Sequence, residues 1–395
     1  MSNVLSSSSD SLSIYLHVPF CTTRCTYCAF NTYTNLEYLV PEFVDALIAE
    51  IRLNGANNTY VQVHSVYFGG GTPSLLSAGQ LAAVLVALHE SFRLTSDSEI
   101  TMEANPNDLS ARYLADLRAI GIDRLSIGLQ SANDDELVLF ARDHNATDVA
   151  GVMRMVRAAG FDNVSLDLIY GLPGQSLSAW QRSVDYLISL QPDHASLYAL
   201  GLEVGTAMYA GVRSGRLPEP DDDLSADMYD LATDALAKTG YVQYEISNWS
   251  KLGMPCVHNL QYWRNLPYVG MGPGAHGYAG GVRYATVRSP RRYINLMRDT
   301  VASDYRFPQT PATVDVVAVG HGDEMIETLI TGLRLINEGI DRSVFCRRFG
   351  VDVLEKYGDI LIRFKDSGLL TIDNEYIRIT RQGRLLTNLI FRELV

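Results

Sequence analysis

Hydrophobic and polar residues follow two different patterns along the first half of the chain. Short runs rich in β-branched and aromatic residues recur, and the segments between them repeat apolar residues at helical spacing. The runs predict strands at 13–20, 65–71, 99–106, 124–131, 163–171 and 195–202, and the segments predict helices at 43–53, 81–92, 111–121, 149–160 and 180–190. Strands that alternate with helices over short connections form parallel sheets from right-handed βαβ units.

The six predicted strands lack the G-x-G-x-x-G turn that is typical of a dinucleotide-binding sheet. We therefore predict an α/β fold whose sheet curves into a partial (β/α)6 barrel. Ligands of parallel barrels bind at the carboxyl ends of the strands. Chemically distinctive residues fall at those ends here, namely Cys21, Gly69–Thr72, Glu103, Gln130 and Asp167. The sequence thus predicts a ligand site at this edge of the sheet.

The rest of the chain predicts a different organisation. We expect four parts: a disordered Ser-rich tail at 1–12, the partial barrel at 13–205, an extension at 206–321, and a small C-terminal domain at 322–395. Within the extension, 241–285 is rich in Tyr, Gly, Asn and Trp and predicts loops with short strands, and 301–321 predicts an irregular link.

The C-terminal part predicts helices, then a two-stranded hairpin, then a last helix, which is the order of a winged-helix-like α+β domain. Such domains often bind DNA, but 341–395 holds ten basic and eight acidic residues, and the whole chain carries a net charge of −13. A negative chain repels phosphate backbones and anionic lipid. We therefore expect no nucleic-acid partner, at most peripheral membrane contact, and a packing or regulatory role for this domain.

The cysteines and the start of the chain indicate a reducing compartment. The chain opens without a basic segment and a following apolar stretch, and it has no run of 18 apolar residues, so we expect a cytoplasmic protein. Three of the five cysteines, Cys21, Cys25 and Cys28, have the spacing Cys-x3-Cys-x2-Cys. Three such thiolates can bind three irons of a cubane cluster and leave a fourth iron open. The alternative is a zinc site with His17 as fourth ligand.

The segment YLHVPFCTTRCTYCAF (15–30) resembles the opening motif of the radical S-adenosylmethionine superfamily, and more narrowly the oxygen-independent coproporphyrinogen III oxidase group. Further segments extend the resemblance over nearly the whole chain: GGGTP (69–73), EANP (103–106), SIGLQS (126–131) and DLIYGLPGQ (167–175). The resemblance implies a [4Fe-4S] cluster on the three cysteines and S-adenosylmethionine (SAM) on the open iron. It implies SAM-binding residues at Tyr15, Tyr27, Gly70, Gly71, Thr72, Glu103, Gln130, Arg142, Asp167 and Ala199.

Some roles in that set agree with the chemistry of the residues. Gly70 and Gly71 would admit the methionyl end of SAM, because they carry no side chain. Glu103 would pair with the cationic amino group, and the fork of Arg142 would match the carboxylate. Asp167, at a strand end, would accept from the ribose hydroxyls.

Two departures from the oxidase pattern favour a different member of the group. The oxidase has a further cysteine two residues after the third, where this chain has Phe30, and it has a longer N-terminal extension. The segment 257–265 also resembles the signature of the haem chaperone subgroup, in which imidazole and aromatic side chains suit a haem. This resemblance implies haem-binding residues at His258, Asn259, Tyr262 and Trp263.

The resemblance as a whole implies a chaperone that receives haem as cargo and passes it to haem-dependent membrane or respiratory proteins, with a separate electron donor. Two alternatives stay open. One is a radical enzyme that acts on a porphyrin or another small molecule, as a decarboxylase or as a methylase that uses two SAM molecules. The other is a zinc-stabilised barrel with a DNA-binding winged helix. The sequence predicts no oligomeric state.

Overall fold

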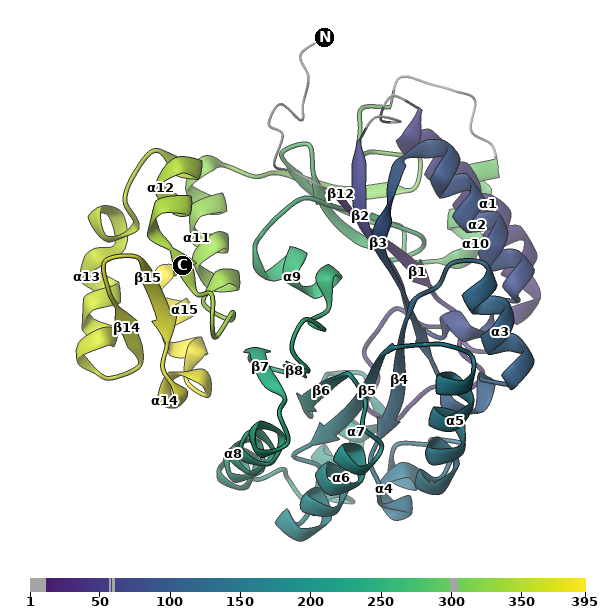
Figure 1. The fold of residues 1–395 in the computed structure, drawn as a ribbon. Coiled ribbons are helices and arrows are strands. Elements are labelled where there is room, and N and C mark those ends of the chain that lie inside the picture. The colour runs from purple at the N-terminus through teal and green to yellow at the C-terminus, as the bar shows by residue number, and fades with distance from the viewer. Residues whose placement is uncertain (1–11, 57, 59–60, 299–304) are drawn as a thin grey trace.

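A computed structural model describes residues 12–56, 58, 61–298 and 305–395 (Figure 1). Six parallel strands form its centre: β1 (Leu12–Val18), β2 (Gln62–Gly70), β3 (Arg93–Ala104), β4 (Arg124–Gln130), β5 (Asn163–Tyr170) and β6 (His194–Ala199). The helices between them are α1 (Val40–Gly55), α2 (Ala78–Ser91), α3 (Ala111–Ala119), α4 (Asp134–Leu139), α5 (Ala146–Ala158) and α6 (Leu177–Ser189). The predicted tail at 1–12 lies outside the described residues except for Leu12, which begins β1.

The strands β1 to β6 pair in sequence order, and every pair is parallel. The two ends of this series do not meet, because β1 pairs on its other side with β9 (Tyr268–Met271) and β6 pairs with β8 (Asn248–Ser250). The sheet therefore stays open, and the predicted partial barrel is confirmed. Of the helices between β1 and β6, only the short α4 was not predicted, because its six residues are too few to show a period.

The core explains why these segments fold as they do. Every residue of β4 is buried, and residues such as Ile14, Phe68, Met102 and Leu166 from successive strands are less than 1% exposed. Burial on both faces gives the near-continuous apolar runs that predicted parallel strands. The amphipathic helices α1, α2, α3 and α5 cover the outer face of the sheet (Figure 1).

The extension continues the same sheet and the same core. Its helices are α7 (Ala207–Arg213), α8 (Asp222–Lys238), α9 (Val257–Trp263) and α10 (Pro290–Arg298), and its further strands are β7 (Val242–Glu245), β10 (His276–Ala279), β11 (Val282–Thr286) and β12 (Thr313–Ala318). The short strands predicted within 241–285 are present as β7 to β11, but the region also contains a helix, α9. The prediction of an irregular link at 301–321 was wrong, because this segment contains the edge strand β12.

The C-terminal elements are α11 (His321–Gly332), β13 (Ile340–Asp341), α12 (Arg342–Phe349), α13 (Val353–Asp366), β14 (Leu370–Ile372), β15 (Tyr376–Ile379), α14 (Arg381–Arg384) and α15 (Thr387–Leu394). They pack around their own core, which includes Leu329, Phe345, Leu361 and Ile377. The predicted order of helices and hairpin is present. Helix α9 contacts both β2 and α11, so it lies between the sheet and this C-terminal unit (Figure 1). Among the described residues, no helix combines the length and the apolar character needed to cross a membrane.

Candidate radical SAM site

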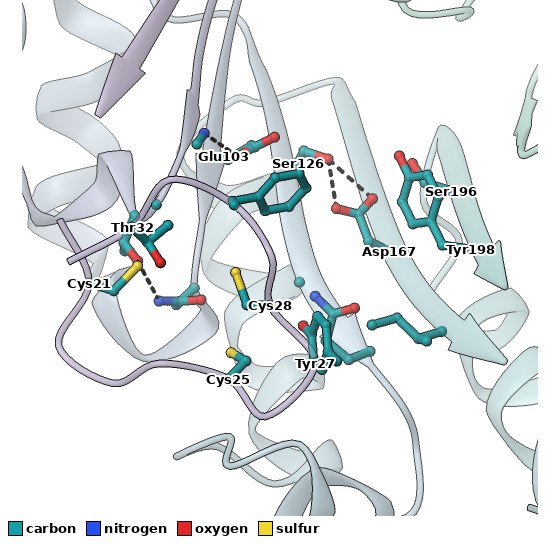
Figure 2. A pocket seen from close by; sticks show the side chains of 18 of the residues that line it. Cys21, Cys25, Tyr27, Cys28, Thr32, Glu103, Ser126, Asp167, Ser196 and Tyr198 are labelled. Carbon is teal, nitrogen blue, oxygen red and sulfur yellow. Dashed lines mark hydrogen bonds between the residues drawn. The ribbon is translucent and has the colours of Figure 1, made fainter. Parts of the chain in front are cut away.

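A cavity of about 490 Å³ opens at the carboxyl ends of the parallel strands, where the sequence predicted a ligand site (Figure 2). Most of the predicted site residues line it: Cys21, Cys25, Tyr27, Cys28, Gly70, Gly71, Thr72, Glu103, Gln130, Arg142, Asp167, Ala199 and Asn259. Four predicted residues do not line it: Tyr15, His258, Tyr262 and Trp263. The wall also contains residues that the sequence analysis did not single out, among them Ser126, Ser196 and Tyr198.

The three cysteines lie on the loop that follows β1, and their side chains border one side of the cavity (Figure 2). Cys21 is buried, and its sulfur accepts a hydrogen bond from Thr72 Oγ1 at 3.4 Å. Burial raises the pKa of the thiols of Cys21 and Cys28. Gly71 N donates to the carbonyl of Val18 at the end of β1, and Thr72 N donates to the carbonyl of Phe20, so these backbone bonds tie the start of the loop to the end of β2.

The arrangement of the thiols tests the two metal hypotheses. Within the described ranges, no three His, Cys, Asp or Glu side chains lie close enough together to hold a single metal ion. His17, the predicted fourth zinc ligand, is buried, and its ring nitrogens bond Tyr15 Oη at 3.1 Å and the carbonyl of Asn31 at 3.0 Å. Three thiols spread along one cavity wall fit a larger cluster that takes one cysteine per iron.

Two glycines at the end of β2 allow His17 and the cysteine loop to pack closely against this strand end. Gly70 has φ +110°, and a Cβ there would lie 2.5 Å from the ring of His17. A Cβ at Gly71 would lie 2.6 Å from the carbonyl oxygen of Phe20 and 3.1 Å from the sulfur of Cys21. Any side chain at Gly71 would therefore displace the loop that carries the thiols.

Glu103 is the second-last residue of β3, and it lines the cavity. Its Oε1 accepts from Tyr67 Oη at 2.9 Å, and its Oε2 accepts from the backbone N–H of Gly70 at 3.1 Å. Burial raises the pKa of Glu103 to about 7, although these hydrogen bonds oppose the rise. The site thus holds a carboxylate that a bound cation would keep ionised.

A second carboxylate, Asp167, lies at the next polar position around the wall. Ser126 Oγ donates to both of its oxygens at 3.2 and 3.1 Å, and Ser165 Oγ donates to Oδ1 at 3.2 Å. Burial raises the pKa of Asp167, and Ser196, its register partner on β6, also bonds it. The signal for these serines was present in the sequence, as polar residues at alternate positions within otherwise apolar strands.

Arg142 is held by two neighbours on the cavity wall. Its Nη1 donates to Asn105 Oδ1 at 2.7 Å, and its Nη2 donates to Tyr27 Oη at 3.1 Å. The guanidinium is therefore fixed beside the cysteine loop, because Tyr27 lies between Cys25 and Cys28 in that loop.

The predicted haem residues lie on or beside α9, and the structure divides them. Asn259 reaches the cavity wall, whereas the side chain of His258 is fully buried. His258 Nδ1 bonds Ser65 Oγ at 2.9 Å and Nε2 bonds Tyr262 Oη at 2.8 Å. Burial lowers the pKa of His258 to about 3, so the ring is neutral. In this arrangement both ring nitrogens are engaged within the protein.

Both ends of α9 are held by charged side chains. At its start, Glu99 accepts from the backbone N–H groups of Val257 and His258, each at 3.2 Å. At its end, the guanidinium of Arg334 lies 4.3 Å from the ring centroid of Trp263. Arg334 belongs to the C-terminal unit, which therefore contacts the predicted haem motif directly.

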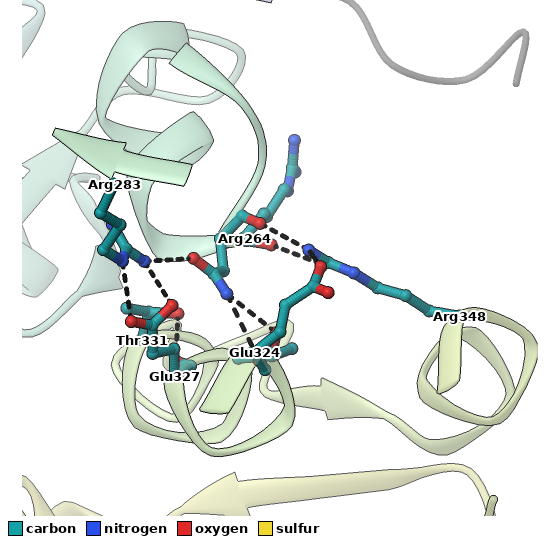
Figure 3. A network of polar contacts seen from close by, with 8 residues as sticks. Arg264, Arg283, Glu324, Glu327, Thr331 and Arg348 are labelled. Carbon is teal, nitrogen blue, oxygen red and sulfur yellow. Dashed lines mark hydrogen bonds and ion pairs between the residues drawn. The ribbon is translucent and has the colours of Figure 1, made fainter. Parts of the chain in front are cut away.

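Asn265, just after α9, belongs to a wider polar network with the C-terminal unit. Figure 3 shows Arg283, Glu324, Glu327 and Arg348 of this network. Asn265 Oδ1 accepts from Arg283 Nη2 at 3.0 Å, and its carbonyl accepts from Arg348 Nη2 at 2.7 Å. Arg283 pairs with Glu327 at 2.6 Å, and Arg348 pairs with Glu324 at 2.7 Å. Movement of α9 thus requires a change at this interface.

Comparison with known families agrees with the fold. Residues 15–187 match the family model described as the radical SAM superfamily, and residues 321–386 match the model described as the HemN C-terminal domain. The structure of coproporphyrinogen III oxidase (HemN) from Escherichia coli superimposes with a TM-score of 0.84 and 23% sequence identity, over 99% of this chain and 91% of that chain. That likeness shows the fold. The class that the fold and the site define is thus the radical SAM superfamily.

Relatives of nearly full length narrow the family. A protein named Heme chaperone HemW from Bacillus subtilis is 36% identical over 380 residues, which cover 96% of this chain and 98% of that protein. A protein of the same name from Mycobacterium tuberculosis is 38% identical over 385 residues, which cover 97% of this chain and 94% of that protein. The chain belongs to the heme chaperone HemW family within that superfamily.

Proposed function

We propose that the protein is a haem chaperone that holds a [4Fe-4S] cluster and SAM and delivers haem to haem-dependent respiratory proteins. The observation that carries this proposal is the shared cavity. The cavity has the three thiols on one wall. The adjoining strand ends carry Gly70, Gly71, Glu103 and Asp167. The names of the full-length relatives support haem as the cargo.

The residues of the cavity fit the implied cofactors. Cys21, Cys25 and Cys28 would hold the cluster, and Gly71 lets the loop that carries them pack closely against the end of β2. Glu103 would pair with the ammonium group of SAM. When bound, the cluster and SAM together supply one-electron cleavage of a carbon–sulfur bond.

Phe30 supports the assignment to a chaperone rather than to the oxidase. It stands where the oxidase pattern has a further cysteine, and its side chain lines the cavity while 67% of it is exposed. An exposed aromatic ring at the cavity offers an apolar face to a porphyrin and no thiol chemistry.

The proposed haem ligand, His258, is buried in this structure. Ligation of iron by His258 requires that its bonds to Ser65 and Tyr262 break, because both ring nitrogens are engaged. We propose that α9 shifts when haem binds and presents His258 to the iron.

Haem titration of the anaerobically prepared full chain tests this function. We expect stoichiometric iron and sulfide, and a Soret shift on addition of haem. The shift should change in His258→Ala and stay unchanged in His276→Ala, because His276 is an exposed histidine outside α9. An absent Soret shift in the unaltered protein would remove the haem role, and a shift unaltered in His258→Ala would remove His258 as ligand.

A radical enzyme acting on a porphyrin is the second candidate. The same cavity favours this candidate, because all of the residues predicted to contact SAM line it except Tyr15. Anaerobic incubation with a reductant, SAM and coproporphyrinogen III, followed by mass analysis of the products, separates the two candidates. Decarboxylated porphyrin would favour the enzyme over the chaperone.

A further inference from the structure

A line of buried polar side chains joins the cavity carboxylate Asp167 to the strand β7. The register of the sheet sets Ser165 of β5 directly beside His194 of β6, one pair of positions below Asp167. Ser165 Oγ donates to Asp167 Oδ1 at 3.2 Å and lies 2.9 Å from His194 Nδ1. On the other side of the ring, His194 Nε2 lies 2.8 Å from Tyr244 Oη. His194 is fully buried, and both of its ring nitrogens have partners within the protein.

The hydrogen positions along this line follow from the chemistry of its members. Burial lowers the pKa of His194 well below its ordinary value, so the ring is neutral and carries one N–H. Because Ser165 spends its single hydrogen on Asp167, His194 Nδ1 must donate to Ser165. His194 Nε2 is then the acceptor, and Tyr244 donates to it. The neutral tautomer of His194 is thereby fixed.

The line returns to the cavity at its far end. Tyr244 is hydrogen-bonded to the side chain of Asn259, which lies on α9 and lines the cavity wall. The chain of contacts therefore begins at Asp167, where SAM hydroxyls are proposed to bind, and ends in the predicted haem motif. The His194 ring joins the two halves of this line.

We propose that His194 is a positioning residue that links the SAM side of the cavity to the haem motif. Through Nδ1 it holds the Ser165 hydroxyl toward Asp167, and through Nε2 it holds Tyr244, which in turn fixes Asn259. This inference rests on the proposed function, because it assigns the two halves of the line to SAM and to haem.

Two substitutions at His194 separate the roles of its two ring nitrogens. In His194→Asn the amide nitrogen takes the place of Nδ1 and keeps the donor to Ser165, but the contact with Tyr244 is lost. In His194→Gln the amide oxygen takes the place of Nε2 and keeps the acceptor for Tyr244, but the contact with Ser165 is lost. Dissociation constants of SAM and of haem are measured on each cluster-loaded protein, alongside the urea midpoint.

We expect a double separation. His194→Asn should retain SAM affinity and weaken haem binding about tenfold, and His194→Gln should do the reverse, since one hydrogen bond is worth about that factor. Ser165→Ala should match His194→Gln, and Tyr244→Phe should match His194→Asn. These two variants keep the test valid if a substitution at His194 prevents folding.

A residue that only packs would respond differently. Equal weakening of both ligands by the Asn and Gln variants, or no weakening by either, would overturn the link through His194. The outcome is distinct from failure of the proposed function, in which the unaltered protein itself would bind no SAM or no haem.

Discussion

Ionised Glu103 lowers the stability of the folded protein, because its carboxylate is buried in the cavity wall. Its pKa is raised from the ordinary 4.5 to about 7, which corresponds to about 3 kcal/mol of differential stability between the protonated and ionised forms. Because the folded state binds the extra proton between these two values, the free energy of unfolding falls as pH rises from 4.5 to 7. Below pH 4.5 the penalty is absent, and above pH 7 it is complete.

The substitution Glu103→Gln isolates this effect, because it removes the titration at that position. Gln also alters the hydrogen bonds to Tyr67 and Gly70, but that change does not depend on pH. The difference in unfolding free energy between the unaltered protein and the variant should therefore shift by about 3 kcal/mol between pH 4 and pH 8, in favour of the variant at pH 8.

Urea unfolding of the cluster-free full chain at the two pH values measures this shift. Glu375→Gln is the matched control, since Glu375 lies in an exposed turn and its substitution should change the free energy by less than about 0.5 kcal/mol. SAM affinity at pH 8 should fall about ten- to a hundredfold in Glu103→Gln, because a charge-assisted contact is lost. A pH-independent difference in stability between the two proteins would refute the reasoning.

Three further substitutions test other parts of the structure. Gly71→Ala should reduce the iron and sulfide content to background, because the new methyl group displaces the cysteine loop. The control Gly79→Ala, in α2, should bind iron normally. A full iron content in Gly71→Ala would contradict the role of Gly71. Glu50→Ala should lower the free energy of unfolding by about 3 kcal/mol or more, since three buried donors lose their acceptor, and a loss below about 1 kcal/mol in urea unfolding would contradict this. Arg283→Ala should speed haem association, measured by stopped-flow, because it loosens the contacts at the end of α9. The double variant Arg283→Glu with Glu327→Arg exchanges the two charges and should restore the slow rate. An unchanged rate in Arg283→Ala would contradict movement of α9 on haem binding.

The fold was predictable because its signals are local. Each strand of the barrel is a short apolar run next to an amphipathic helix, and the cavity residues follow the strand ends in sequence. Glu103 and Asp167 could be placed on one wall without knowledge of any contact, since parallel strands present their carboxyl ends at the same edge. The same rule placed the cysteine loop beside Gly71.

The burial of His258 could not be predicted in this way. Its partner Ser65 lies 193 positions earlier in the chain, so the contact depends on how the extension folds back onto β2. The helical form of α9 was missed for a related reason. Its seven residues give little periodic signal, and its start is stabilised by the distant carboxylate of Glu99 rather than by a local capping residue.

The proposed SAM-binding and haem-binding parts of the site differ in the same way, since the first depends on local contacts and the second on distant ones. The residues proposed to bind SAM lie at strand ends that the barrel fixes directly. The residues proposed to bind haem lie on α9, which is held at one end by Glu99 and at the other by Asn265 and the C-terminal unit. A chaperone must release its cargo, and a short helix held by polar contacts can move at lower cost than a strand of the core. The C-terminal unit is thus in a position to control access to His258, and the Arg283 variants test this directly.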